Sequence, residues 1–432
     1  KCAQTHASLA ATCTENQHRT LYSRRTSTCF LLRLLYRALT CTKRSLLYNT
    51  NYRTFSIQCK RPERRWQGLK FQISNFHTTQ KLNYPVSLLL CFGSIYCGHF
   101  VRKWWLKQTV EQQQKYIRWF KQRKHTIYGS LGFLSFILFI YYLTYLEKDP
   151  VKKKPRLILI DRAQQIEDAK ILFQIIVQNE KNVVPLHDPK YRIIATALKR
   201  LINSNKNLFK DTDWTITIIH RMFNIVSFPN VMILPDRNII ILSDIFNFIK
   251  SNDQLTFILA HEMSHDMLLH TSETLSFGMI HNVTTIVSSF LIWVFYERGT
   301  AATLCSIMYI LFAAIFSWYK RQSEIEADEV GLELAAKSCI DLREVLVFWE
   351  IMKKFEELAT QNKFQIPLFM DHPTLDKREK RTIQLMPTAL ELRRQAKCPE
   401  LPARDPRDRL PYYMKDIEKH MLKDSRILGM RF

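Results

Sequence analysis

The sequence predicts an α+β fold that is mostly helical, with a small β-sheet, preceded by a transmembrane helix. The chain has 432 residues but only 9 glycines, which favours long helices over a turn-rich β fold. Apolar residues recur at helical spacing in 163–203, whereas WTITIIH at 214–220 alternates and is rich in β-branched residues, as a strand is. An uncharged stretch at 127–146 is long enough to cross a bilayer.

Residues 1–80 are rich in Ser and Thr and carry fourteen Lys and Arg against two acids, Glu15 and Glu63. Half of the net charge of +24 therefore lies in the first fifth of the chain. This composition is typical of a mitochondrial transit peptide, and the alternative is a disordered basic tail. Strong basicity also suits nucleic-acid binding, but the chain has no nucleic-acid-binding motif, so we expect no such partner.

Residues 81–126 form a basic juxtamembrane region that begins with a weak apolar segment, 82–101, interrupted by Asn83 and Pro85. Between 102 and 124 lie eight Lys and Arg against a single acid, Glu111. Such a segment stays on the matrix side by the positive-inside rule. We therefore predict one span, 127–146, with the following domain in the intermembrane space. The basic residues also suit an anionic membrane lipid such as cardiolipin.

A globular domain is expected over 157–390, followed by a charged C-terminal tail at 391–432 that is expected to include a peripheral helix. Its elements after the first strand are a hairpin of 231–234 and 238–242, and a helix that a capping box at Ser251 and Gln254 opens. That helix is predicted to run through DQLTFILAHEMSHDMLLH, which ends at His270. The apolar runs within 275–319 predict a helical hairpin, either inserted in the membrane or buried in the domain.

The pentapeptide HEMSH at 261–265 fits the pattern HExxH on a helix. Residues four apart share one helix face, so His261 and His265 can bind one zinc ion. Glu262 between them can act as a general base toward water. His270 follows His261 by nine residues, about 180° around an uninterrupted helix, so we expect it to be structural.

Zinc catalysis needs a third protein ligand, and the segment RQSEIEAD at 321–328 offers carboxylates on a helix. Glu324 and Asp328 share a face, so Glu324 is the candidate ligand and Asp328 a candidate partner for a ligating histidine. Glu326 points to the opposite side. The alternative for this segment is a solvated acidic helix face.

The ten cysteines include no CxxC pair, and seven of them precede residue 100. This distribution is typical neither of a secreted disulfide framework nor of a cysteine-type zinc site.

The order HEMSH, two apolar helices, RQSEIEAD and then DHPTLDKR at 371–378 resembles the HtpX-type and CAAX-prenyl-endopeptidase superfamily of membrane gluzincins. The resemblance covers about 210–385 and departs from the usual pattern at Asp236-Arg237, where these enzymes carry glycines. It implies a zincin-type metalloprotease domain that binds one Zn²⁺ per subunit. His372 and Arg378 match its HPxxxxR motif and are candidates to donate hydrogen bonds to the substrate carbonyl oxygen. The strand residues Val231, Met232, Ile233 and Leu234 are candidates to pair with an extended substrate.

The transit-like N-terminus and the strong span are similar to those of the Oma-type branch, mitochondrial inner-membrane metalloendopeptidases. The branch implies stress-activated cleavage of inner-membrane proteins, including a dynamin-like fusion GTPase, as well as self-cleavage and homo-oligomers. Two alternatives remain open at this point. One is a CAAX-prenyl-type endopeptidase of the endoplasmic reticulum, and the other is a zinc-stabilised membrane scaffold without activity.

Overall fold

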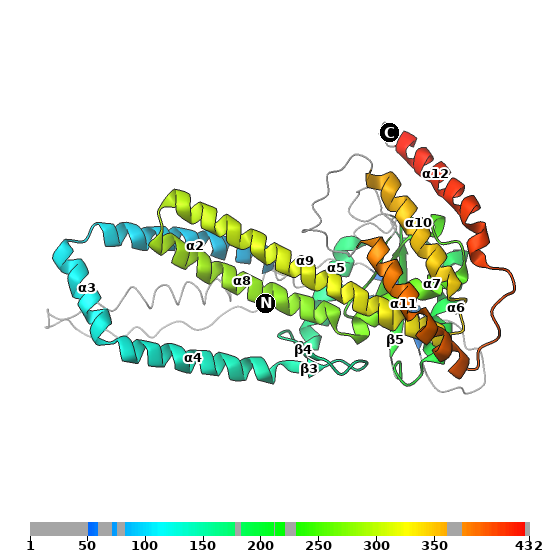
Figure 1. The fold of residues 1–432 in the computed structure, drawn as a ribbon, viewed down its shortest axis with the longest axis horizontal. Helices are drawn as coiled ribbons and strands as arrows, with labels where there is room; N and C mark the ends of the chain where they lie inside the picture. Colours follow the sequence, from blue (N-terminus) through cyan, green and yellow to red (C-terminus); the bar gives the residue numbers. More distant parts are fainter. Residues whose placement is uncertain are drawn as a thin grey trace, which may run out of the picture. The chain divides into compact units, whose positions relative to one another are not determined.

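The computed structural model describes residues 51–58, 71–75, 83–177, 183–210, 212–220, 230–360 and 374–427. It is mostly helical with two small sheets, which confirms the predicted fold class (Figure 1). The strands are β1 (Asn51–Gln58), β2 (Phe71–Asn75), β3 (Leu146–Lys148), β4 (Pro155–Leu157), β5 (Asp213–Ile219), β6 (Val231–Ile233) and β7 (Asn238–Leu242). The helices are α2 (Asn83–Leu106), α3 (Val110–Gln122), α4 (Lys124–Thr144), α5 (Arg162–Ile176), α6 (Pro189–Ser204), α7 (Asn252–Met267), α8 (His270–Phe295), α9 (Arg298–Lys337), α10 (Arg343–Thr360), α11 (Leu375–Gln395) and α12 (Leu410–Ile427), with short 3₁₀ turns η2 (Ser243–Asn247) and η4 (Pro406–Arg409).

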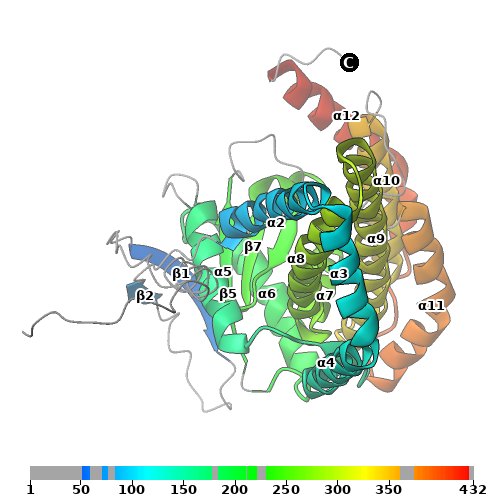
Figure 2. The same ribbon diagram turned by 90° about the vertical axis from the view of Figure 1, so that its left-hand side faces the viewer.

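The larger sheet has five strands in the order β2-β1-β5-β7-β6 (Figure 2). β5 and β7 run parallel with Ile216 opposite Ile239, whereas β6 returns antiparallel to β7, so the predicted strand and hairpin are confirmed. The hairpin turn tolerates the residues that replace the usual glycines. Arg237 adopts a φ of 61°, and the Asp236 carboxylate accepts a hydrogen bond from the Asn238 amide.

Two strands lie within residues 1–80, where composition alone predicts no regular structure. β1 alternates in sequence (NYRTFSIQ) and pairs antiparallel with both β2 and β5. A segment with alternating polar and apolar residues can form a strand when a neighbouring strand is available for pairing. The count of charged residues on which the prediction for this region rests does not detect such a pattern. The boundary of a transit peptide stays a prediction.

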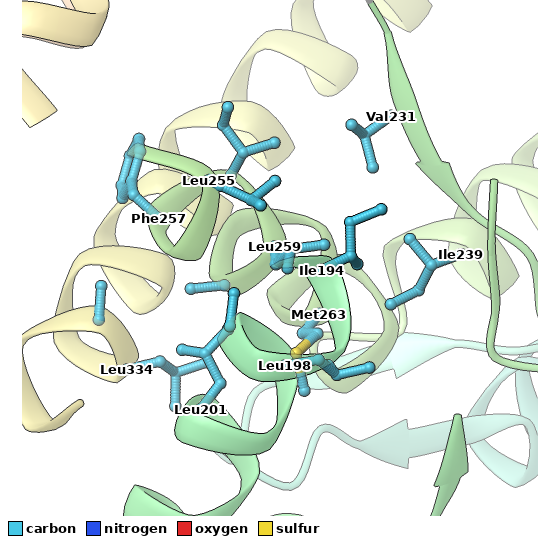
Figure 3. Packing of buried hydrophobic residues seen from close by; sticks show 14 of the residues in the cluster. Ile194, Leu198, Leu201, Val231, Ile239, Leu255, Phe257, Leu259, Met263 and Leu334 are labelled. Carbon is cyan, nitrogen blue, oxygen red and sulfur yellow. The ribbon is translucent and has the colours of Figure 1, made fainter. Parts of the chain in front are cut away.

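The core lies between the sheet and helices α6 and α7. Helix α6 buries Ile194, Leu198 and Leu201, spaced four and three residues apart on one face. Figure 3 shows this face against Leu259 and Met263 of α7, the helix that carries the HExxH motif. Because its side chains are buried on several sides, α7 is fixed in place by the core.

Among the residues that the structure describes, three helices are long and apolar enough to cross a membrane: α4, α8 and α9. In α4, large apolar side chains such as Phe136 and Leu138 are exposed along its length. Helices α8 and α9 form the expected hairpin, and α2 lies alongside α8 in both views (Figures 1 and 2). A Cβ at Gly98 of α2 would meet the Phe290 carbonyl oxygen at 2.5 Å, so the glycine permits this close approach. How many of these helices span a bilayer stays a prediction.

The C-terminal helices close the domain around the end of α9. Tyr413 and Ile417 of α12 are buried against Val347, Ile351 and Phe355 of α10. The helix expected in the C-terminal segment is therefore present and packs against the domain. A disulfide joins Cys339, just after α9, to Cys398, just after α11. Spacing does not single out this pair, because the two cysteines are 59 residues apart.

Candidate metal centre

Helix α7 begins as predicted and ends three residues earlier than predicted. The Ser251 hydroxyl accepts the Gln254 amide hydrogen bond, but the Gln254 side chain accepts from the Lys250 amide instead of completing a capping box. The helix ends at Met267, and Leu269 adopts the left-handed conformation with a φ of 58°. The prediction of one helix through His270 is therefore wrong. The left-handed Leu269 interrupts the helical backbone hydrogen bonds, and α8 begins at His270 in a new direction.

The three predicted metal ligands lie together among the described residues. One side-chain atom each from His261, His265 and Glu324 all fall within 4.8 Å of one another. The two Nε2 atoms are 3.2 Å apart, and the Glu324 oxygens lie 3.7 Å from His261 Nε2 and 3.5 Å from His265 Nε2.

These separations fit zinc. Donors about 2.0–2.1 Å from a tetrahedral ion stand roughly 3.3 Å apart, close to what the three side chains show. Two imidazoles and one carboxylate are also the protein ligand set of many catalytic zinc sites, which keep a fourth position open. The residues present therefore fit a zinc ion.

A glycine allows α9 to bring Glu324 to α7. A Cβ built at Gly331 would lie 2.9 Å from the Cα of His261 and 3.0 Å from its amide nitrogen. Real Cβ atoms do not approach backbone this closely, so only glycine lets the two helices touch here.

Asp328, the candidate partner of a ligating histidine, lies beside His261. Its Oδ1 lies 2.9 Å from His261 Nδ1, a hydrogen-bonding distance, although the ring N–H is not aligned for a linear bond. Asp328 also accepts two hydrogen bonds from Arg378, from Nε and Nη2, both at 2.7 Å. The guanidinium lies 4.6 Å from the ring centre of Trp349. Thus Arg378 reaches the site through Asp328, and its Nη1 lies 3.3 Å from Glu324.

The ionisable groups of the site shift one another's pKa values. Burial works against the charged form of His261, but the neighbouring Asp328 outweighs it, so the pKa of His261 is raised. Burial and the nearby His261 hold the pKa of His265 well below its usual range, which favours the neutral form that binds metal. Burial disfavours the charge on Arg378, yet Asp328, Glu324 and Glu262 together raise its pKa. Glu262 is therefore close enough to interact electrostatically with the guanidinium.

Other predicted site residues lie at different places. His372 is outside the described residues. Val231, Met232 and Ile233 form β6, with Leu234 directly after it, and among the described strands β6 is at an edge of the sheet and pairs with β7.

His270 is the residue whose surroundings the sequence does not predict. Its Nδ1 lies 3.1 Å from Nδ1 of His265, and its Nε2 lies 3.3 Å from Glu326. The expectation that it lies on the far side of the zinc helix fails because the helix ends before it. The sequence feature that could have indicated this contact is the presence of a third histidine five residues after His265.

The comparisons with known proteins agree with this geometry. A model of peptidase family M48 matches residues 190–383. "Metalloendopeptidase OMA1, mitochondrial" of Danio rerio is 30% identical over 325 residues, 73% of this chain and 66% of the relative. The Homo sapiens protein of the same name is 29% identical over 369 residues, 82% of this chain and 68% of the relative. "Mitochondrial metalloendopeptidase OMA1" of Saccharomyces cerevisiae is 25% identical over 262 residues, 59% of this chain and 72% of the relative. The chain thus spans about two thirds of the length of the animal relatives.

Proposed function

Because the chain belongs to peptidase family M48 and carries the His-His-Glu metal site of its metalloendopeptidases, we propose that it is a zinc endopeptidase of the mitochondrial inner membrane. Its proposed role is stress-activated cleavage of inner-membrane proteins, including a dynamin-like fusion GTPase. The cluster of His261, His265 and Glu324, with Glu262 on the same helix, carries the proposal.

The proposed chemistry is hydrolysis of a peptide bond. When bound by the three ligands, zinc supplies Lewis acidity that makes water a nucleophile near neutral pH. Glu262 accepts the proton from the attacking water and delivers it to the leaving amine. His372 is proposed to donate a hydrogen bond to the carbonyl oxygen as charge develops on it.

Arg378 is proposed to act mainly as a positioning residue. Its Nε and Nη2 groups donate to Asp328, which leaves Nη1 beside Glu324 for any further contact. In this way one guanidinium holds both the partner of His261 and the third ligand.

Edge strand β6 is proposed to bind the substrate as an added strand. Among the described strands it pairs with β7, and it packs against α7, the helix with the metal ligands. Backbone pairing would require an extended substrate segment and would impose little sequence preference.

The membrane arrangement is also a proposal. Helix α4 is proposed to span the inner membrane with the catalytic domain in the intermembrane space, while the basic helix α3 remains on the matrix side near anionic lipid such as cardiolipin. Helices α8 and α9 expose Val283, Val287, Ile310 and Ile315. We propose that this hairpin enters the same bilayer, which adds to the span predicted from sequence and returns the chain to its starting side. Homo-oligomers and self-cleavage are expected from the same resemblance.

The test compares wild type with Glu262→Gln in mitochondria that lack the endogenous enzyme. After dissipation of the membrane potential, the fusion GTPase is followed by immunoblot. Glu391→Gln, the same chemical change at an exposed position on α11, is the control. Cleavage by wild type and the control, but not by Glu262→Gln, supports the proposal. Cleavage by all three removes Glu262 from the mechanism, and cleavage by none favours the scaffold. Failure of import into isolated mitochondria would favour the endoplasmic-reticulum alternative.

A further inference from the structure

The two ligating histidines have different partners behind them. His261 has Asp328, whereas the Nδ1 atom of His265 faces another imidazole, that of His270, at 3.1 Å. The Nε2 atom of His265 is the one that faces His261 and Glu324. His265 therefore offers Nε2 to a metal and holds its proton at Nδ1, because a neutral imidazole carries one N–H.

The proton on His265 Nδ1 determines which nitrogen of His270 is protonated. The His265 Nδ1–H donates to Nδ1 of His270, which must be unprotonated to accept. His270 then carries its own proton at Nε2, 3.3 Å from a Glu326 carboxylate oxygen that can only accept. His270 is 2% exposed, so water does not compete for these groups.

Basic side chains bind Glu326 at the end of this series of hydrogen bonds. Arg156 Nη2 donates to Glu326 at 2.6 Å and Lys154 Nζ at 2.7 Å. Arg156 also donates to Glu273 at 3.1 Å. The two basic residues come from β4 and the turn before it. In that turn the Asp149 carboxylate accepts hydrogen bonds from the backbone amides of 151–154.

The break after α7 makes the contact possible. On a continuous helix, residue 270 would lie about 140° around the axis from His265 and would point away from it. The left-handed Leu269 turns the chain, so that the first residue of α8 lies against the metal ligand.

We propose that His270, Glu326 and Arg156 form a hydrogen-bonded chain that fixes the tautomer and orientation of His265, with His270 as its positioning residue. The inference rests on the proposed function only in taking His265 as a zinc ligand. It gives the Glu326 carboxylate, which no catalytic step uses, a function: it is the anchor of the second histidine, as Asp328 is of the first. Ligating histidines whose outer partner is removed lose metal affinity.

The test measures zinc affinity of the full chain purified in detergent, by competition with a chelator of known affinity. His270→Ala is expected to bind zinc about 10- to 100-fold more weakly than wild type. His270→Asn places an oxygen acceptor near the former Nδ1 and should recover most of the affinity. Glu326→Gln removes the anchoring charge and should weaken binding. Glu329→Gln is the matched control: this carboxylate lies on the same helix and pairs with Lys152 and Arg381 but does not contact His270. It should bind zinc like wild type.

A second readout separates positioning from general destabilisation. Cobalt(II) in place of zinc reports ligand geometry by its visible spectrum, which should change in His270→Ala and be restored in His270→Asn. Equal zinc affinity of wild type and His270→Ala would overturn the inference. A loss in Glu329→Gln as large as in Glu326→Gln would also overturn it. If wild type itself binds no zinc, or if His261→Ala binds it equally well, the proposed function fails instead.

Discussion

Gly331 of α9 lies directly against the backbone of His261 in α7, and an added Cβ would stand 2.9 Å from the His261 Cα. The third ligand, Glu324, lies two helical turns earlier on α9. The distance between the two helices at Gly331 therefore controls how closely the carboxylate approaches the histidines.

Gly331→Ala is expected to separate α7 from α9 and to weaken zinc binding, because the clash is with backbone and not with a flexible side chain. Overpacking of this kind costs about 1–3 kcal/mol of stability. The measurements are denaturant unfolding and zinc content after dialysis. Gly278→Ala on α8 is the control, since a Cβ there meets no atom within 4 Å. Unchanged zinc content in Gly331→Ala would contradict the prediction.

Arg378→Lys should be far more harmful than Arg381→Lys on the same helix. Arg378 makes a buried bidentate pair with Asp328, which a lysine cannot reproduce, and Arg381 pairs with Glu329 near the surface. The loss of one hydrogen bond to a charged group costs roughly 1.5–3 kcal/mol. Thermal unfolding and cleavage rate test the difference. Similar behaviour of the two variants would argue against a positioning role for Arg378.

Removal of zinc with a chelator is expected to abolish cleavage and lower the unfolding temperature. The reason for the second effect is that an ion bound only to the folded state stabilises it, by about 4 kcal/mol at a thousand times its dissociation constant. Differential scanning calorimetry with and without chelator measures the shift. Added zinc should restore both properties. The same shift in His261→Ala would show that it does not come from this site.

Loss of the Cys339–Cys398 disulfide should destabilise the domain, because the bond closes a loop with a sequence separation of 59 residues. The chain-entropy estimate for such a loop is about 4 kcal/mol. Urea unfolding of a variant with both cysteines replaced by serine would measure the loss. Cys305→Ser, at a free cysteine of α9, should have little effect. Equal unfolding midpoints would contradict the prediction.

The attachment of α12 should weaken in acid. The hydrogen bond from Lys250 lowers the pKa of Asp416, and the two side chains are 2.7 Å apart. A lowered folded pKa means that this contribution to stability is fully present above the unfolded value, about 3.9, and is lost as pH falls through the folded one. Limited proteolysis of α12 against pH measures it. In Asp416→Asn, the part of the increase in proteolysis between neutral pH and pH 3 that comes from this pair should be absent. A pH profile of proteolysis identical to that of wild type would refute the role of the pair.

Much of the site could be predicted from sequence because its residues follow local periodicity. His261 and His265, and likewise Glu324 and Asp328, share helix faces at a spacing of four. The strand at 213–219 shows alternation, and the strand at 238–242 is a short apolar run next to a turn. Spacing and chemistry therefore identified His261 and His265 as candidate ligands, whereas Glu324 stayed one of two readings of its segment until the resemblance to the gluzincins favoured it.

Only the tertiary structure decided how these pieces meet. The sequence does not show that Leu269 turns the chain and brings His270 to His265, that Gly331 lets α9 touch α7, or that Cys339 pairs with Cys398. Two of these three contacts join residues about 60–70 positions apart, and the third depends on where a helix stops. Each contact depends on how whole helices pack around a shared core. That packing is the sum of many small contacts between distant residues, so it cannot be predicted from any short segment of the sequence.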